Sequence, residues 1–272
     1  MIKEYRTAIV TGASRGVGVY IARALAKEGM DLVLAARNVA GLDRVASELK
    51  SLGVRAVSVP TDITDLNALK NLVSVAEEEH GSIDVLVNNA AVDSPIFFHK
   101  ERLEVIEQIM ATNLTAPMLL TQLVLPGMIQ RQRGHIVNIA SLVAKIPFPY
   151  DVAYATSKAG LAHFTASLRA EYRGTGVSAS TIMAGAFTNT GLSAQALKDT
   201  GVIQPKSVPT SPPEMAGQAV ISVLKKDLPE IGIPAPALMF TRNPALGTLF
   251  LKGTGIIGMI KQVAEARARM QK

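Results

Sequence analysis

The sequence predicts an α/β fold in which a doubly wound parallel sheet carries helices on both faces. Short, β-branched apolar runs alternate with longer stretches of helical periodicity up to about residue 225. These runs are apolar on both faces, as are the strands of a parallel sheet that helices cover on each side. The chain has 272 residues, of which 48% are apolar and 18% charged. It is therefore long enough to bury one large core, and we expect a single domain.

The alternation gives each element a position along the chain. Strands are expected at Thr7–Thr11, Asp31–Ala35, Ala56–Pro60, Val85–Asn88, His135–Ile139 and Ser178–Ile182. Between them, helical periodicity predicts helices that include Gly18–Glu28, Gly41–Leu52, Leu66–His80 and Tyr154–Tyr172. Parallel strands joined in this way require right-handed crossovers.

Two regions interrupt the alternation. Residues 189–212 are rich in Ser, Thr, Gly and Pro and lack a clear period, so we expect a long substrate loop there. Residues from about 228 to 272 form an apolar extension that ends in a basic helical stretch. This extension is interpreted either as a last strand that packs against the domain or a partner subunit, or as a peripheral membrane contact.

Composition excludes several classes of site. The chain has no cysteine, which excludes a disulfide framework, a thiolate nucleophile and a thiolate-bound metal. Its four histidines lack the spacing of metal ligands, so no catalytic metal is expected. The net charge of +6 comes from scattered basic residues, which argues against nucleic acid as a partner. Without a secretory leader or a long apolar run, a cytoplasmic location is expected, with peripheral membrane association as the alternative.

A glycine-rich turn, Thr11-Gly12-Ala13-Ser14-Arg15-Gly16-Val17-Gly18, joins the first strand to the first helix. Glycines there let the main chain approach a pyrophosphate, and the helix N-terminus offers free N–H groups and a positive dipole end. The turn predicts a dinucleotide site, although an ordinary strand-to-helix turn has similar glycines. The residues expected to contact the cofactor here are Gly12, Ser14, Arg15, Gly16, Val17 and Gly18.

The end of the second expected strand indicates which cofactor binds. An enzyme that selects NAD(H) places an acid near this point, whereas a 2′-phosphate needs a cation. The chain has Arg37 there and no acid at position 36 or 37, and Arg15 is placed to reach the same phosphate. NADP(H) is therefore predicted in preference to NAD(H).

The T-G-x-x-x-G-x-G spacing of this turn, together with Tyr154-Ala155-Thr156-Ser157-Lys158, resembles the short-chain dehydrogenase/reductase family in its compact Rossmann-type branch. Tyr154 and Lys158 share one face of a helix, because they are four residues apart. Ser141 precedes Tyr154 by thirteen residues, at the family's spacing, and Asn113 matches the family asparagine. The resemblance covers residues 7–190.

The resemblance implies a role for each catalytic residue. Ser141 would orient the substrate oxygen, and Tyr154 would donate a proton to it. Tyr154 and Lys158 would also contact the cofactor. Lys158 would bind the nicotinamide ribose and lower the pKa of Tyr154. Asn113 would kink its helix and hold a water against the lysine.

Further cofactor contacts follow from the resemblance alone. Asp62 and Ile63 would contact the adenine, although Asp62 is also a candidate acid at the N-terminus of a helix. Asn89, Ala90 and Ala91 would steady the sheet beside the cofactor, with Ala91 in place of the family's glycine. Thr188 is the first choice for holding the nicotinamide carboxamide; Asn189 and Thr190 stay open, because Ala184 replaces the proline usual in this segment.

The implied function is interconversion of a carbonyl and a secondary alcohol with NADP(H). Apolar residues after Ser141, namely Leu142, Val143, Pro147 and Phe148, favour a hydrophobic substrate such as a steroid-like, acyl or lipid-like ketone. The family implies a homodimer or homotetramer formed through the helices that bear Asn113 and Tyr154. The alternative is a non-catalytic NADP(H)-binding sensor or scaffold on the same fold.

Overall fold

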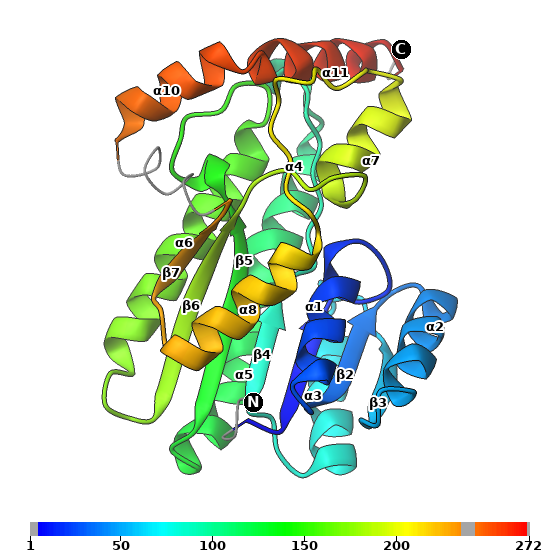
Figure 1. Cartoon of the computed structure of the whole chain (residues 1–272), viewed down its shortest axis with the longest axis vertical. Helices are drawn as coiled ribbons and strands as arrows, with labels where there is room; N and C mark the ends of the chain where they lie inside the picture. The colour runs from blue at the N-terminus through cyan, green and yellow to red at the C-terminus, as the bar shows by residue number, and fades with distance from the viewer. Residues whose placement is uncertain (1–4, 235–242, 271–272) are drawn as a thin grey trace.

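The computed structural model describes residues 5–234 and 243–270 and contains one seven-stranded parallel sheet. The strand order is β3-β2-β1-β4-β5-β6-β7 (Figure 1). The strands are β1 (Thr7–Thr11), β2 (Asp31–Ala36), β3 (Ala56–Pro60), β4 (Val85–Asn88), β5 (Gly134–Ser141), β6 (Val177–Ala184) and β7 (Glu230–Ile233). The predicted doubly wound sheet is thus confirmed, and β7 is the last strand that one interpretation of the extension required.

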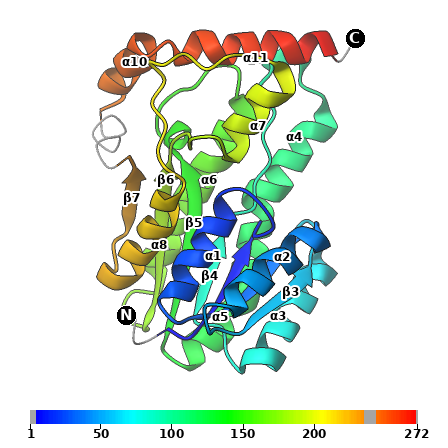
Figure 2. The same cartoon turned by 45° about the vertical axis from the view of Figure 1, so that its right-hand side comes forward.

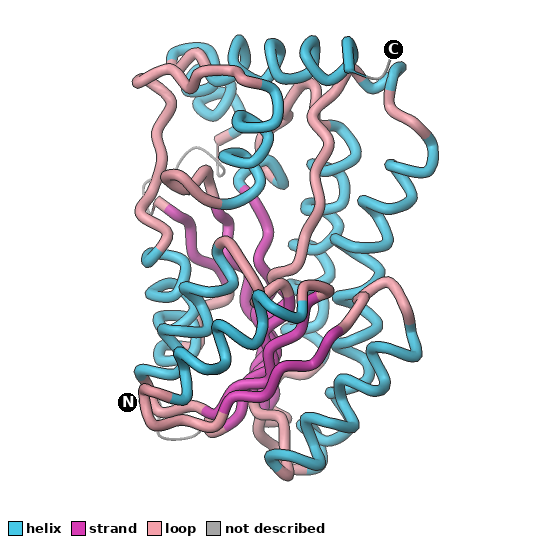
Figure 3. The backbone as a smooth tube through the Cα atoms, turned by 90° about the vertical axis from the view of Figure 1, so that its right-hand side faces the viewer, coloured by secondary structure: helices cyan, strands magenta, loops and turns pink. Residues whose placement is uncertain are grey.

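Helices lie on both sides of this sheet, as the tube view shows (Figure 3). The α-helices are α1 (Val17–Lys27), α2 (Val39–Lys50), α3 (Leu66–His80), α4 (Leu103–Met110), α5 (Ala116–Gln130), α6 (Val152–Glu171), α7 (Gly191–Thr200), α8 (Glu214–Lys226), α10 (Pro244–Gly253) and α11 (Ile256–Met270). Short 3₁₀ turns occupy Phe98–Lys100 and Leu142–Ala144, and a π-helical turn, Ala111–Thr115, joins α4 to α5.

The strands are buried on both faces because successive side chains enter different cores. In β1, Ala8 and Val10 pack with α1, α2 and α8, whereas Ile9 packs with α3 and α5. In β2, Leu32 and Val33 divide between the two cores in the same way. Continuous apolar runs in the sequence therefore correspond to strands with no exposed face.

Residues 189–212 differ from the predicted loop, because α7 occupies their first half. Its helical period is weak, since Ala196 is the one buried residue in the helix. The extension also folds back: α10 and α11 run across the carboxyl end of the sheet, with α11 beside α7 (Figure 2). Residues 235–242 of the extension lie outside the described residues.

The helical stretch Leu103–Gln130 is the one part of the described chain that is long and apolar enough to cross a membrane. Half of its most apolar window is buried within the fold. It packs against α3 and α6 and carries the π-helical turn. Packing in the core therefore explains the apolar residues of the buried half.

The strand order creates a crevice at the carboxyl edge between β1 and β4. The chain leaves β1 toward β2 on one side and leaves β4 toward β5 on the other. In open α/β sheets, ligands bind where the order reverses in this way. The fold therefore places the glycine-rich turn and the loop after β4 on either side of one site.

Candidate active site

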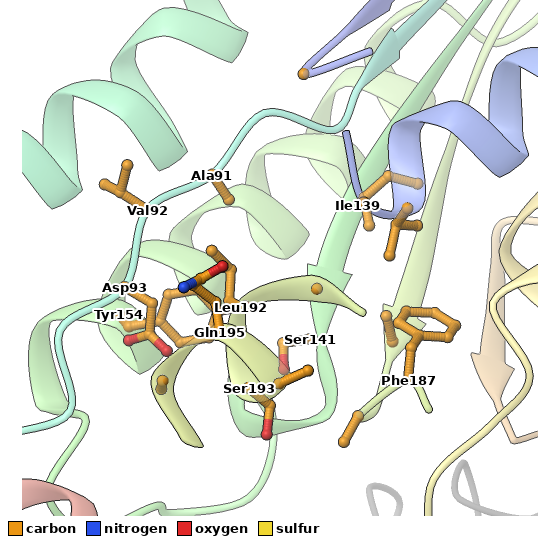
Figure 4. A pocket seen from close by; sticks show the side chains of 18 of the residues that line it. Ala91, Val92, Asp93, Ile139, Ser141, Tyr154, Phe187, Leu192, Ser193 and Gln195 are labelled. Carbon is orange, nitrogen blue, oxygen red and sulfur yellow. The ribbon is translucent and has the colours of Figure 1, made fainter. Parts of the chain in front are cut away.

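A cavity of about 1150 Å³ lies at this edge of the sheet. Its walls come from the loops after β1 to β6, from α7 and from α11. Figure 4 shows side chains of this wall, including Ser141, Tyr154 and Phe187. All of the predicted site residues line the cavity except three, which are Gly18, Asn113 and Thr188.

The glycine-rich turn has the backbone that a phosphate cradle requires. Gly12 and Gly16 have φ values of 68° and 64°, which favour glycine. Asn89 holds the turn by donating from Nδ2 to the carbonyl of Thr11 at 2.9 Å. Helix α1 then begins without a side-chain cap and without an acid in its first turn. Its first N–H groups and its dipole are therefore available to an anion.

Gly18, in the first turn of α1, packs closely against the glycine-rich turn. An added Cβ would contact the carbonyl oxygen of Gly12 and would lie 2.8 Å from Asn89 Nδ2. We expect Gly18→Ala to lower the free energy of unfolding by about 1–3 kcal/mol, because the helix must move away from the turn. NADPH binding should weaken with it. Thermal unfolding and NADPH fluorescence titration measure the two effects. Gly253→Ala is the control, because a Cβ there meets open space. Equal behaviour of the two variants would contradict the prediction.

Two exposed arginines line the cavity in the loops after β1 and β2. Arg15 and Arg37 both line it, and Ala36 occupies the place where an acid would select NAD(H). Asp62 also lines the cavity and accepts hydrogen bonds from Thr64, at 2.7 Å from its hydroxyl. These bonds, and then the charge of Arg37, hold the pKa of Asp62 below its usual value.

The alternative role of Asp62 as a helix cap is not what the structure shows. The N-cap of α3 is Asp65, whose carboxylate accepts from the amide of Asn67 at 2.8 Å. Asp62 instead fixes the turn before it. Asp62 lines the cavity wall, and its contact with the adenine stays a prediction.

Ser141, Tyr154 and Lys158 come together in one wall of the cavity. Ser141 is the last residue of β5, and Tyr154 and Lys158 follow on α6. The Ser141 and Tyr154 hydroxyls are within hydrogen-bonding reach of each other. Lys158 is 2% exposed, and its Nζ donates to the carbonyl of Ile139 at 2.9 Å and lies 5.7 Å from the centre of the Tyr154 ring. The geometry can therefore hold a substrate oxygen beside a proton donor.

The pKa of Tyr154 in this structure differs from the expected direction. Burial, followed by the charges of Asp93 and Asp151, raises the pKa above its ordinary value, and the hydrogen bond with Ser141 opposes the increase. Burial lowers the pKa of Lys158 to about 8, against the charge of Asp93. Tyr154 is therefore a protonated donor at neutral pH, as carbonyl reduction requires.

The lowered pKa of Lys158 predicts a pH-dependent stability. The unfolded chain, with an ordinary lysine pKa of about 10.5, binds a proton more tightly than the folded chain does. Stability should therefore rise with pH from about 8 to 10, by up to about 3 kcal/mol. Lys158→Met should lack this rise. Denaturant unfolding of both proteins at each pH measures the difference, and parallel curves would contradict the prediction.

Asn113 lies in the π-helical turn and is fully buried. Its Oδ1 accepts from the amide of Val92, and its Nδ2 donates to the carbonyl of Val92, both at 2.9 Å. Nδ2 also lies 3.1 Å from Ser157 Oγ. The distortion of the helix that the resemblance implies is present. The side chain fixes the loop after β4, and the residue of the turn that lines the cavity is Thr112.

Thr188 is not placed as its predicted role requires. Its hydroxyl bonds to that of Thr210 at 2.8 Å, and the residue is exposed outside the cavity. Asn189 and Thr190 line the cavity instead. Asn189, between Thr188 and Thr190, has a left-handed backbone conformation with φ at 55°.

Sequence reasoning missed three parts of the cavity wall. Asp93 enters it from the loop after β4, and Asp151 enters it at the start of α6. Four residues of α11 also line it, namely Ile256, Met259, Ile260 and Val263. Asp151 could have been noticed as an acid three residues before Tyr154. Nothing in the sequence indicated that α11 lies over the site.

No group of three or more His, Cys, Asp or Glu side chains suited to a metal ion occurs within residues 5–234 and 243–270.

Comparison with known proteins matches the chain to dehydrogenases and reductases. Residues 6–201 match the family model for short chain dehydrogenase. Ketoacyl reductase HetN of Nostoc sp. is 41% identical over 226 residues, which cover 83% of this chain and 77% of that protein. A metagenomic short-chain oxidoreductase in complex with NADP is similar in structure, with a TM-score of 0.71, 32% identity, and coverage of 83% of this chain and 95% of that one. A variant of actinorhodin polyketide ketoreductase with NADPH gives a TM-score of 0.75 at 27% identity, covering 86% and 97%.

Proposed function

The chain belongs to the short-chain dehydrogenase family, and on this premise we propose that it is an NADP(H)-dependent oxidoreductase that interconverts a carbonyl and a secondary alcohol. The observation that carries the proposal is the meeting of Ser141, Tyr154 and Lys158 in a cavity that also contains the glycine-rich turn. The non-catalytic sensor is the weaker candidate, because it would have no use for a proton donor held in this way.

The residues present suit a phosphorylated dinucleotide. Gly12 and Gly16 leave the space and backbone angles that a pyrophosphate needs, and the uncapped start of α1 faces it. Arg15 and Arg37 would hold a 2′-phosphate, which their planar guanidinium groups match with paired donors. The complexes of the similar structures with NADP and NADPH support this choice. When bound, the reduced nicotinamide supplies the hydride.

The protein's own residues supply orientation and the proton. The Ser141 hydroxyl donates to the substrate carbonyl oxygen and holds it beside the Tyr154 hydroxyl. Tyr154 transfers its proton to that oxygen as negative charge develops there, and in the reverse reaction its phenolate accepts the proton. Lys158 would hold the ribose, and its positive charge would stabilise the phenolate after the transfer. Thr190, the N-cap residue of α7, is our choice to hold the carboxamide.

We propose an apolar substrate, because α11 covers the cavity with aliphatic side chains. Met259 and Ile260 are buried there, and Phe148 and Leu197 of the facing segments pack against this cluster. The extension from residue 228 would thus serve mainly as part of the substrate site, although its exposed leucines on α10 leave a peripheral membrane contact as the second candidate. The ketoacyl and polyketide reductases among the similar proteins support an acyl-type ketone.

Ile260→Ser is expected to raise KM for long-chain ketones about fivefold to twentyfold, because the hydroxyl replaces apolar surface that lines the cavity. KM for a short ketone such as butanone should change less than twofold. Initial-rate kinetics with NADPH measure both. Gln262→Ser, on the exposed side of the same turn, is the matched control, and an equal change for both ketones would contradict the apolar site.

The test of the function itself is oxidation of NADPH and NADH with a panel of ketones. Turnover with NADPH supports the proposal, and tight NADPH binding without turnover of any ketone supports the sensor. A homodimer or homotetramer and a cytoplasmic location are proposed on the basis of the family. Light scattering at several protein concentrations and fractionation of cells test these two points separately.

A further inference from the structure

Two carboxyl groups face each other beside the catalytic tyrosine. Asp93 and Asp151 lie within hydrogen-bonding reach of each other, and both line the cavity. Figure 4 shows Asp93 next to Tyr154 in this wall. Asp151 is 6% exposed, and Oδ1 of each carboxyl is shielded from solvent and has no hydrogen-bonding partner in the protein. Buried acceptors without a donor are rare, so this arrangement needs an explanation.

The backbone fixes the pair in place. Asn113 binds both polar groups of the Val92 peptide, next to Asp93. The amide of Ile96 donates to the carbonyl of Tyr150 at 2.8 Å and so ties the loop after β4 to the start of α6. The two acids are therefore held at the site by the fold itself, not by flexible surface loops.

Both acids of the pair hold a proton more tightly than an isolated carboxyl group does. Burial and the charge of Asp93 raise the pKa of Asp151 well above its usual value, and burial also raises the pKa of Asp93. The neighbouring charges are Arg267 of α11, Lys158 and Glu101. Arg267 donates from Nη1 to the carbonyl of Asp93 at 3.4 Å. Two cations, Arg267 and Lys158, thus already face the pair.

These charges determine what the pair can bind. A ligand ammonium would have to approach Arg267 and Lys158 as well, which would repel it. A neutral hydroxyl meets no such repulsion, and it can donate to a carboxylate oxygen where the pair lines the cavity. Such a bond to a charged acceptor is stronger than one between neutral groups. The rest of the substrate wall is mainly aliphatic, so the ligand is apolar apart from this group.

We propose that Asp93 and Asp151 bind a hydroxyl group that the substrate carries next to its reacting carbonyl, so that the enzyme prefers apolar hydroxyketones, and the corresponding diols, to simple ketones. This inference rests on the proposed carbonyl–alcohol reaction at the same site. The hydroxyl is bound and is not transformed, and the pair acts as a specificity determinant.

Benzoin and deoxybenzoin test the proposal, since they differ only by the hydroxyl next to the ketone. We expect kcat/KM with NADPH to favour benzoin by about 10- to 100-fold. In Asp93→Ala and in Asp151→Asn the ratio of the two values should fall at least fivefold. Because the ratio is taken within each variant, partial misfolding does not change it. Glu101→Gln removes a nearby carboxylate that does not line the cavity and should retain the wild-type ratio.

The outcomes separate this inference from the proposed function. If both ketones are reduced with similar kcat/KM, or if the variants retain the benzoin preference, the hydroxyl site is wrong and the oxidoreductase stands. If neither ketone is reduced, calorimetric titration of the NADP complex with hydrobenzoin and diphenylethanol decides the question without turnover. Tighter binding of hydrobenzoin that is lost in Asp93→Ala supports the site, and equal affinities overturn it.

Discussion

Tyr154→Phe is expected to reduce kcat for carbonyl reduction by about 10²- to 10⁴-fold, which is the range of a lost general acid. The ring that phenylalanine retains preserves packing against Lys158, so the loss reports on the hydroxyl alone. Affinity for NADPH should change little, because the cradle around the glycine-rich turn is untouched. Stopped-flow or steady-state oxidation of NADPH, with fluorescence titration of binding, measures both quantities.

Tyr172→Phe is the matched control for this prediction. Tyr172 follows the last residue of the same helix and lies outside the cavity. It should keep wild-type turnover. Retention of more than a tenth of the activity in Tyr154→Phe would show that another group donates the proton, and a buried acid such as Asp151 would then be the first candidate.

Replacing both Arg15 and Arg37 by alanine is expected to weaken NADPH binding about a hundredfold while leaving NADH binding within threefold. Each arginine offers charge-assisted hydrogen bonds to the 2′-phosphate, which NADH lacks. The effect should shrink at high salt, because both side chains are exposed and their charges are screened. Dissociation constants for the two cofactors at two ionic strengths measure the change in preference.

Arg44→Ala provides the comparison for general charge effects. Arg44 is an exposed cation on α2 that does not line the cavity. It should leave the ratio of NADPH to NADH affinity unchanged. An equal loss for both cofactors in the double variant would mean that the arginines act on the shared pyrophosphate, and the predicted selectivity would be wrong.

The sequence determined the fold and the positions of the candidate catalytic residues along the chain. The six expected strands recur as β1 to β6 with ends that differ by at most two residues. Their prediction succeeded because strands buried on both faces give unbroken apolar runs, such as the one in β1. Tyr154 and Lys158 could be paired from the sequence because helical spacing alone puts them on one face. The likeness of Ser141 and the glycine-rich turn to the family then located the site.

The tertiary structure decided what surrounds those residues. Helix α7 carries little apolar periodicity, so its sequence resembles that of a loop. In the structure it is a helix that packs against α11. Asp93 and Asp151 are far apart in the sequence, and only the crossing of the loop after β4 with the start of α6 brings their carboxyl groups together. The pKa of Tyr154 depends on burial and on the charges of these two acids, which act on the tyrosine through space. Local sequence encodes helices, strands and turns, whereas the protonation of a buried site depends on distances between segments that the folded chain alone sets.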